Sequence, residues 1–297
     1  MKVFITGATG YIGFNVAQAF RRAGHEVFGL ARSGNKAAVL LKNEIHPVMG
    51  NMQLPDSYES VAADCSVLIH TAAEYGPSCG ELDRKTVETL LQANQHGTRP
   101  KTLVYTSGIW VHGNTACKLV DETTPLAPVK AVAWRPAVEK MVLDATDVHG
   151  LVIRPGCVYG RGGGLTGMWF AGAARENAVT VIGDGKNHWS MVHVDDLAEG
   201  YRLAGESGLR GEAFIFAESS YPTLEEMVRA AAQVAGENSE IRFNPLEEAR
   251  KSMTDFAEAL ALDQHADAGK AKRILGWRPQ HHGFVSEVAT YYEAWKD

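Results

Sequence analysis

The chain reads Thr6-Gly7-Ala8-Thr9-Gly10-Tyr11-Ile12-Gly13 directly after a short apolar segment, Lys2–Ile5, which we predict to be a strand. The residues that follow, Tyr11–Ala23, place apolar side chains at helical spacing and end at Gly24, where a glycine commonly terminates a helix. A glycine-rich turn that leaves a strand and opens a helix is the context in which this pattern binds a pyrophosphate. The stretch therefore predicts the first unit of a nucleotide-binding α/β fold.

The glycines of this turn have separate roles. Gly7 allows a tight turn, Gly10 lets a pyrophosphate approach the backbone, and Gly13 lets the helix pack closely on the strand. The free N–H groups and the dipole at the helix start favour the anion. We therefore expect a dinucleotide to contact Gly7, Thr9, Gly10, Tyr11, Ile12 and Gly13.

Strand and helix patterns alternate through the first half of the chain. We predict further strands at Glu26–Ala31, Ile45–Met49, Val67–His70, Thr102–Thr106 and Leu151–Arg154. Helical patterns lie between them, including Glu81–Gln95 and Val132–Thr146. This alternation predicts an α/β protein with a doubly wound parallel sheet covered by helices on both faces.

The rhythm changes after Gly160. We predict a dinucleotide-binding domain over residues 1–160 and a smaller substrate lobe over 161–297, interleaved with the last strands of the sheet. The elements expected there are strands at Val179–Ile182 and Glu212–Phe216 and helices at Asp195–Ala204, Thr223–Ala235 and Phe284–Lys296. Thr223 with Glu226 three residues later predicts a capping box. The polar segment Asn244–Asp267 gives no clear element.

Composition excludes several classes of protein. Apolar residues make up 45% of the 297 residues, which is too many for a disordered chain. The net charge is −6, from 29 basic and 35 acidic residues, so we expect no nucleic-acid partner. Apolar runs are too short for a membrane span or a signal peptide, and we expect a cytoplasmic protein. The four cysteines form no CxxC pair, so we expect free thiols and no metal site.

The end of the second strand discriminates between NAD and NADP. An acidic residue there would bind the ribose 2′-hydroxyl of NAD. This chain instead has Arg32-Ser33-Gly34-Asn35-Lys36. Arg32 can hold a 2′-phosphate, Ser33 can donate a hydrogen bond to it, and Lys36 adds positive charge. The sequence therefore favours NADP(H).

Four further motifs follow in order along the chain. They are DCSVLIHTAA at residues 64–73, LVIRPGCVYG at 151–160, MVHVDDLA at 191–198 and LGWRP at 275–279. Together with the glycine turn they resemble the extended short-chain dehydrogenase/reductase family, also called the NAD-dependent epimerase/dehydratase family. The resemblance extends from residue 2 to residue 279.

The resemblance implies where the rest of the cofactor lies. Asn51 and Met52 would lie near the adenine, and Thr71, Ala72 and Ala73 would line the path of the pyrophosphate and ribose. Residues expected beside the nicotinamide are Thr106, Pro155, Gly156 and Val158. Many members of the family are homodimers, which here would use the predicted helices Glu81–Gln95 and Val132–Thr146.

The sequence departs from the family at the acid–base site, where the family has a Ser/Thr–Tyr–Lys arrangement. Alignment on Glu139 puts Ala131 in the place of the tyrosine and Arg135 in the place of the lysine. Gly108 takes the place of a serine, for which its neighbour Ser107 can substitute. Arg135 can hold the ribose and favour a developing oxyanion, but it cannot shuttle a proton because it stays charged.

The residue that replaces the tyrosine as proton donor is left open by the sequence. The candidates are Lys130, His112, Tyr75, Tyr159 and His188, or a water molecule. His188 follows a glycine-rich loop that would face the substrate in such folds, and histidine has a suitable pKa. We name Ser107, Arg135 and His188 as the candidate catalytic residues.

Three functions remain compatible with these residues. The first is an NADP(H)-dependent oxidoreductase acting on a small carbonyl, alcohol or related compound. The second keeps the family but changes the reaction to epimerisation, dehydration or lyase chemistry. The third, suggested by the missing tyrosine and lysine, is a regulator that binds NADP, senses redox state and has no turnover. One fold hosts many functions, so the fold does not separate them.

Overall fold

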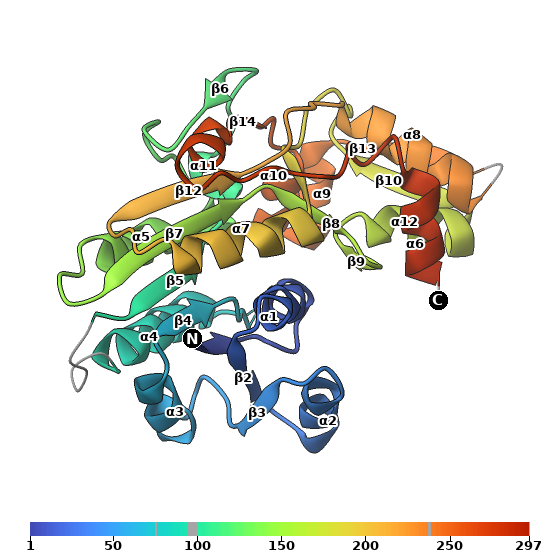
Figure 1. Ribbon diagram of the computed structural model, residues 1–297. Coiled ribbons are helices and arrows are strands. Elements are labelled where there is room, and N and C mark those ends of the chain that lie inside the picture. Colours follow the sequence, from blue (N-terminus) through green and yellow to red (C-terminus); the bar gives the residue numbers. More distant parts are fainter. Residues whose placement is uncertain (75, 94–99, 237–238, 297) are drawn as a thin grey trace.

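Seven parallel strands form the central sheet of the computed structural model, which describes residues 1–74, 76–93, 100–236 and 239–296 (Figure 1). The strand order is β12-β7-β5-β4-β1-β2-β3. Its strands are β1 (Lys2–Thr6), β2 (Glu26–Ala31), β3 (His46–Met49), β4 (Val67–His70), β5 (Thr102–Thr106), β7 (His149–Pro155) and β12 (Glu212–Phe216). The order reverses direction between β1 and β4, which makes the carboxyl ends of these two strands the switch point of a doubly wound fold.

Helices cover both faces of this sheet, as the alternating pattern predicted. One apolar core joins the sheet to α1 (Tyr11–Arg22), α2 (Gly34–Lys42), α7 (Val194–Glu206) and α11 (Gly269–Ile274). A second core, on the other face, joins it to α3 (Glu59–Asp64), α4 (Cys79–Gln92) and α5 (Arg135–Leu143). The sheet therefore has no large solvent-exposed face, as expected of parallel strands.

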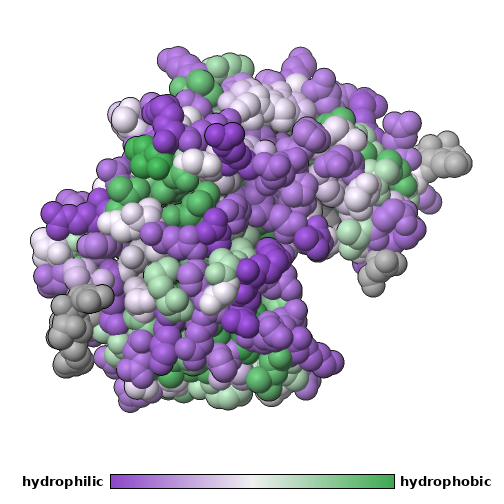
Figure 2. Space-filling view, viewed as in Figure 1, coloured by the Kyte–Doolittle hydropathy of each residue, from purple (hydrophilic) through white to green (hydrophobic). Residues whose placement is uncertain are grey.

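The remaining elements form a lobe with its own core (Figure 1). Its helices are α6 (Gly167–Glu176), α8 (Leu224–Ala235), α9 (Leu246–Met253), α10 (Asp255–Leu260) and α12 (Val288–Lys296). Its strands pair as β10 (Ala178–Ile182) with β13 (Glu240–Asn244). In a second small sheet, β8 (Cys157–Gly160) pairs with both β11 (Met191–His193) and β9 (Gly163–Gly164). A further short pair joins β6 (Leu119–Val120) to β14 (His265–Ala266). The surface is hollowed between the lobe and the N-terminal part of the chain (Figure 2).

The strand predictions agree with the structure to within two residues at each end. The capping box at Thr223 is also confirmed, with both of its hydrogen bonds present. β12 lies beyond residue 160 yet pairs with β7, so the second half of the chain completes the sheet.

Three predicted helices differ from the observed ones. The helix predicted over Phe284–Lys296 is α12, which begins later, at Val288. The prediction of one helix over Val132–Thr146 is wrong, because a short 3-10 turn, η3 (Lys130–Val132), precedes α5, which spans only Arg135–Leu143. Pro136 suits this new start, since its missing N–H would have no partner in the first turn. The helix predicted over Glu81–Gln95 is α4, which begins earlier, at Cys79; Gln95 lies outside the described residues.

Across the described part of the chain, no helix combines the length and apolar character needed to cross a membrane.

Candidate functional site

The glycine turn after β1 forms a tightly packed cradle. Gly7 has a positive φ of 72°, and a Cβ added there would lie 2.7 Å from the Ala72 nitrogen. A Cβ at Gly13 would lie 2.3 Å from the Gly7 oxygen. Only glycine therefore fits at both positions, and the first turn of α1 approaches the end of β4 directly. Thr71 fixes this approach because its hydroxyl donates to the Thr6 carbonyl at 2.7 Å.

A cavity of about 490 Å³ opens over this cradle. It is lined by twelve of the predicted cofactor residues: Gly7, Thr9, Gly10, Tyr11, Ile12, Gly13, Arg32, Asn51, Met52, Thr71, Ala72 and Ala73. Leu30, Lys36 and Glu74 complete the wall. The size and the free backbone N–H groups fit the adenosine and pyrophosphate of a dinucleotide.

Two predicted cofactor residues do not line this cavity or the larger one beside it. Ser33 caps α2 instead, its Oγ accepting a hydrogen bond from the Lys36 backbone at 3.4 Å. The Thr106 hydroxyl is 2.6 Å from the hydroxyl of Tyr201. Both side chains therefore have partners within the protein.

Glu74 is a wall residue that the sequence analysis did not identify. Arg32 Nη1 lies 3.0 Å from Glu74 Oε1, and Gln53 Nε2 donates to the other carboxylate oxygen at 3.3 Å. Arg32 is therefore already paired with an anion where we expect it to meet a 2′-phosphate. The residue directly follows the family-like motif that ends at Ala73, so its position was the available signal.

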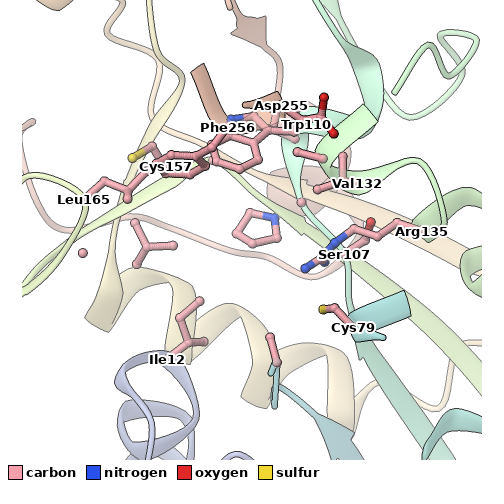
Figure 3. A pocket seen from close by; sticks show the side chains of 18 of the residues that line it. Ile12, Cys79, Ser107, Trp110, Val132, Arg135, Cys157, Leu165, Asp255 and Phe256 are labelled. Carbon is pink, nitrogen blue, oxygen red and sulfur yellow. The ribbon is translucent and has the colours of Figure 1, made fainter. Parts of the chain in front are cut away.

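A second cavity of about 800 Å³ shares Tyr11, Ile12 and Ala73 with the first. The predicted residues Ser107, Arg135, Pro155, Gly156 and Val158 line it (Figure 3). Large apolar side chains make up much of the rest: Trp110, Val132, Trp134, Leu165 and Phe256. The two cavities together form a continuous site across the carboxyl edge of the sheet.

Arg135 and Ser107 lie side by side at one end of this larger cavity (Figure 3). Arg135 Nη1 donates to the Thr106 carbonyl at 2.8 Å, which anchors the guanidinium at the end of β5. Arg135 Nε and Ser107 Oγ are both buried and have no hydrogen-bond partner among the described residues. A buried polar atom without a partner is costly, so these two atoms indicate where a polar atom of a ligand would bind.

A buried hydrogen-bond network supports this end of the cavity. Asp83 of α4 accepts from Tyr105 at 2.6 Å and from Trp134 Nε1 at 3.2 Å. His70 lies 3.0 Å from Asp83 and 2.6 Å from Thr6 Oγ1, at the end of β1. Burial acts to raise the pKa of Asp83, but the hydrogen bonds from His70 and Tyr105 outweigh it and lower that pKa. An ionised Asp83 therefore ties the glycine turn to Trp134, the residue that precedes Arg135.

None of the described proton-donor candidates lines the larger cavity. Lys130 is exposed and lies 3.3 Å from Asp255. His112 is buried, and burial followed by the charge of Arg154 lowers its pKa to about 4. The buried Tyr159 hydroxyl donates to Glu218, and burial raises the pKa of Tyr159. Tyr75 lies outside the described residues.

His188, which we expected to face the substrate, also lies elsewhere. Its Nδ1 is 2.7 Å from Asp263, in a cluster between the lobe and the β6 loop. The loop that carries it turns toward the segment after α10, which the sequence pattern could not place.

The larger cavity instead contains titratable side chains that the sequence did not indicate. Cys79 and Cys157 line it, and burial raises the pKa of both thiols, that of Cys157 to about 12. Asp255, at the start of α10, also lines it. Tyr11 is in the wall too, but its hydroxyl donates to the Gly160 carbonyl at 2.8 Å.

Comparison with known proteins gives the chain its relatives. Residues 3–216 match the family described as NAD dependent epimerase/dehydratase. An uncharacterized protein of Schizosaccharomyces pombe is 27% identical over 301 residues, covering 98% of this chain and 99% of that protein. A 4-hydroxy-2-methyl-3-oxo-4-farnesyl-3,4-dihydroquinoline-1-oxide ketoreductase of Stigmatella aurantiaca is 27% identical over 262 residues, covering 84% of this chain and 78% of that protein.

Solved structures share the fold at lower sequence identity. The dTDP-glucose 4,6-dehydratase of Bacillus anthracis, in complex with NAD, aligns with a TM-score of 0.84 and 19% identity. The alignment covers 100% of this chain and 96% of that one. At this identity the likeness establishes the fold alone.

Proposed function

The chain belongs to the NAD-dependent epimerase/dehydratase family, and from that premise we propose that it is an NADP(H)-dependent oxidoreductase that reduces a carbonyl group on a largely apolar substrate. The observation that supports this proposal most directly is a pair of buried atoms, Arg135 Nε and Ser107 Oγ, that have no hydrogen-bond partner among the described residues. They lie at one end of a cavity lined mainly by aromatic and aliphatic side chains. A carbonyl oxygen is an acceptor that both groups can satisfy.

The residues of the chain polarise that oxygen. When NADPH is bound across the two cavities, its chemistry would be hydride donation to the carbonyl carbon. Arg135 and Ser107 donate hydrogen bonds to the oxygen as it gains negative charge, which is where preorganised donors accelerate a reaction most. Arg135 is held for this by its bond to the Thr106 carbonyl and by the Trp134 ring, 5.7 Å from its guanidinium carbon.

The proton must come from another source, since Arg135 stays charged. We assign this step to water, because no tyrosine–lysine pair lines the cavity within the described ranges. The alternative proton donor within the protein is the Cys79 thiol, which lines the same cavity.

The wall of the cavity favours apolar substrates over nucleotide sugars. The Stigmatella relative is named for a cyclic ketone that carries a farnesyl chain, which is the kind of substrate that Trp110, Phe256 and Leu165 could pack against. A sugar would leave its hydroxyl groups without partners on such a wall. Arg32 and Lys36 in the smaller cavity support the preference for NADP(H) over NAD(H).

The test is single-turnover fluorescence of bound NADPH, with a panel of apolar aldehydes, ketones, imines and enones. We expect at least one class to oxidise NADPH, and Arg135→Ala to slow that step by about a hundredfold. Arg22→Ala, an exposed arginine at the end of α1, is the matched control and should leave the rate unchanged. Loss of turnover in Cys79→Ala, with NADPH still bound, would show that the thiol rather than water is the donor.

A second candidate function is an NADP-binding regulator without turnover. It is favoured by Ala131, which lines the cavity at the position where the family resemblance expects tyrosine. Tight NADPH binding together with no oxidation by any compound of the panel would support the regulator and contradict the oxidoreductase.

A further inference from the structure

Four potential metal ligands meet outside the two cavities. Cys117, His188, Asp263 and His265 each offer one ligand atom, and these four atoms all lie within 4.8 Å of one another. The residues come from three segments: the loop before β6, the loop before β11, and the stretch that runs from the end of α10 into β14. The ligands are far apart in sequence and include no CxxC pair, which explains why the sequence analysis predicted no metal site.

We propose that these four residues bind a structural zinc ion. One thiolate, two imidazoles and one carboxylate are ligand types that zinc accepts, and four protein ligands are typical of a closed structural site. A sulfur ligand disfavours magnesium and calcium, which prefer oxygen.

Two of the ligand-to-ligand distances can be compared with those of a tetrahedral site. Bonds of about 2.0–2.3 Å to zinc place neighbouring ligand atoms roughly 3.3–3.7 Å apart. His188 Nδ1 is 2.7 Å from Asp263 Oδ1, and His265 Nδ1 is 4.0 Å from Asp263 Oδ2. The rings of the two histidines are 4.4 Å apart. The two nitrogen–oxygen distances lie within about 0.7 Å of the separation expected around zinc.

One ligand atom lacks any other role in the described structure. His265 Nδ1 is buried and has no hydrogen-bond partner among the described residues. A buried ring nitrogen without a partner is unfavourable, and a metal ion would satisfy it. The ring is held in place by the edge-on Tyr221 ring, 4.8 Å away.

Backbone hydrogen bonds already hold the ligands together. Asp263 accepts from the Cys117 nitrogen at 2.6 Å and from the His188 nitrogen at 2.9 Å. The His265 nitrogen donates to Thr115 Oγ1 at 3.1 Å, and that hydroxyl donates to the Asp263 carbonyl at 3.0 Å. Such outer hydrogen bonds orient metal ligands, so zinc would bind with little rearrangement.

The site would connect the lobe to the wall of the substrate cavity. Gln264, between two of the ligands, donates to the carbonyls of Ile109 and Gly113 at 3.1 Å. Ile109 and its neighbour Trp110 line the cavity, as does Phe256 of α10. A metal at this position would therefore rigidify two sides of the cavity that come from distant parts of the chain.

A second cluster, His193, Asp195 and His281, is a weaker candidate. His193 Nδ1 accepts from the Asp195 nitrogen at 3.1 Å, and Asp195 pairs with Arg161. His281 Nδ1 is 3.0 Å from Asp196. These three residues all have other partners, so we do not propose a metal ion there. A variant of this cluster, His281→Ala, is used below to test whether the metal binds at this second place instead.

Cobalt is the probe, since Co²⁺ replaces zinc and reports thiolate ligation by absorption. The full chain is stripped with a chelator, titrated with Co²⁺, and then with Zn²⁺. We expect one cobalt per chain, a sulfur-to-cobalt charge-transfer band in the near ultraviolet, and displacement by zinc. Zinc should also raise the melting temperature of the stripped protein.

Variants localise the ion. Cys117→Ser should remove the charge-transfer band and the thermal shift by zinc, and His265→Ala should abolish tight binding. His46→Ala, an exposed histidine elsewhere, should change neither. Unchanged NADPH binding would show that the exposed Cys117 variant is folded. The proposal fails if stripped protein binds neither metal at micromolar concentration, or if binding survives Cys117→Ser and is lost in His281→Ala.

Discussion

Glu74 is the residue on which the cofactor preference depends most directly. Its carboxylate holds Arg32 at 3.0 Å and lines the same cavity. A 2′-phosphate that binds Arg32 would approach this carboxylate, while the 2′-hydroxyl of NAD would not be repelled. Under the proposed function, Arg32 favours NADP(H), and the adjacent carboxylate of Glu74 limits the strength of that preference.

We predict that Glu74→Gln tightens NADPH binding about five- to tenfold. Two negative charges of a phosphate roughly 6 Å from a carboxylate cost about 1.4 kcal/mol in water, and the substitution removes this repulsion. NADH affinity should change less than twofold. Fluorescence titration with both cofactors measures the two dissociation constants.

The matched control is Glu44→Gln, because Glu44 forms a similar surface pair with Arg21 at 3.1 Å, outside both cavities. A large loss of NADH affinity in Glu74→Gln would contradict the prediction. It would show that Glu74 binds the ribose and that the protein prefers NAD(H).

Individual site residues were predictable where spacing alone positions them. The turn residues Gly7 to Gly13 follow from one strand, one helix and three glycines. Asp255 and Phe256 could not be predicted, because they reach the cavity through tertiary packing of a segment without a clear pattern. Thr254, with a φ of 52°, connects α9 to α10 there.

At the scale of elements, the contact between α4 and the start of α5 determines the position of Arg135 in the wall of the larger cavity. A Cβ added at Gly80 would lie 2.7 Å from Cγ of Trp134. Trp134 also donates to Asp83 and precedes Arg135. A close approach of these two elements therefore positions the first turn of α5.

We predict that Gly80→Ala lowers the free energy of unfolding by roughly 1–2 kcal/mol, the usual effect of overpacking. It should also slow NADPH oxidation, because displacing Trp134 weakens its bond to Asp83. Chemical denaturation and single-turnover kinetics measure the two effects. Gly34→Ala is the control for stability, since an added Cβ there meets nothing within 4 Å. Equal stability of the two variants would contradict the packing argument.

The predictability of elements follows their length and burial. Strands of the sheet are almost fully buried and read as apolar runs, so their positions were predicted well. α9 and α10 have only 8 and 6 residues, and helices this short depend on tertiary packing rather than on propensity. α5 was predicted too long for a related reason, because Arg135 and Pro136 start a new helix where the apolar pattern continues unbroken.

At the scale of the whole molecule, the two halves of the chain are not separable. β12 completes the sheet from the second half, and α7 packs against α1. The larger cavity is lined by residues from both halves of the chain. We therefore treat the pH dependence of the free energy of unfolding for the whole chain.

Two buried histidines contribute to the acid response above pH 4. Burial and the charge of Arg154 lower the pKa of His112 to about 4, and burial together with His281 lowers that of His193 to about 4. Both have an ordinary pKa of 6.5. Glu122 and Glu218 act in the opposite direction, since burial raises their pKa values.

We predict that His112→Gln makes the protein less sensitive to acid. Between pH 6.5 and pH 4 the unfolded chain binds a proton at His112 that the folded chain does not, so stability falls as the pH falls through this window. A folded pKa near 4 removes about 2 kcal/mol between pH 7 and pH 5. Glutamine can still accept a hydrogen bond from Arg154 but does not titrate, so the variant should lose about 2 kcal/mol less stability than the wild type over this range.

Urea denaturation at the two pH values measures the difference, with His46→Gln, an exposed histidine, as the control. Parallel pH profiles for wild type and His112→Gln would contradict the prediction, because they would show that folding does not lower the pKa of His112.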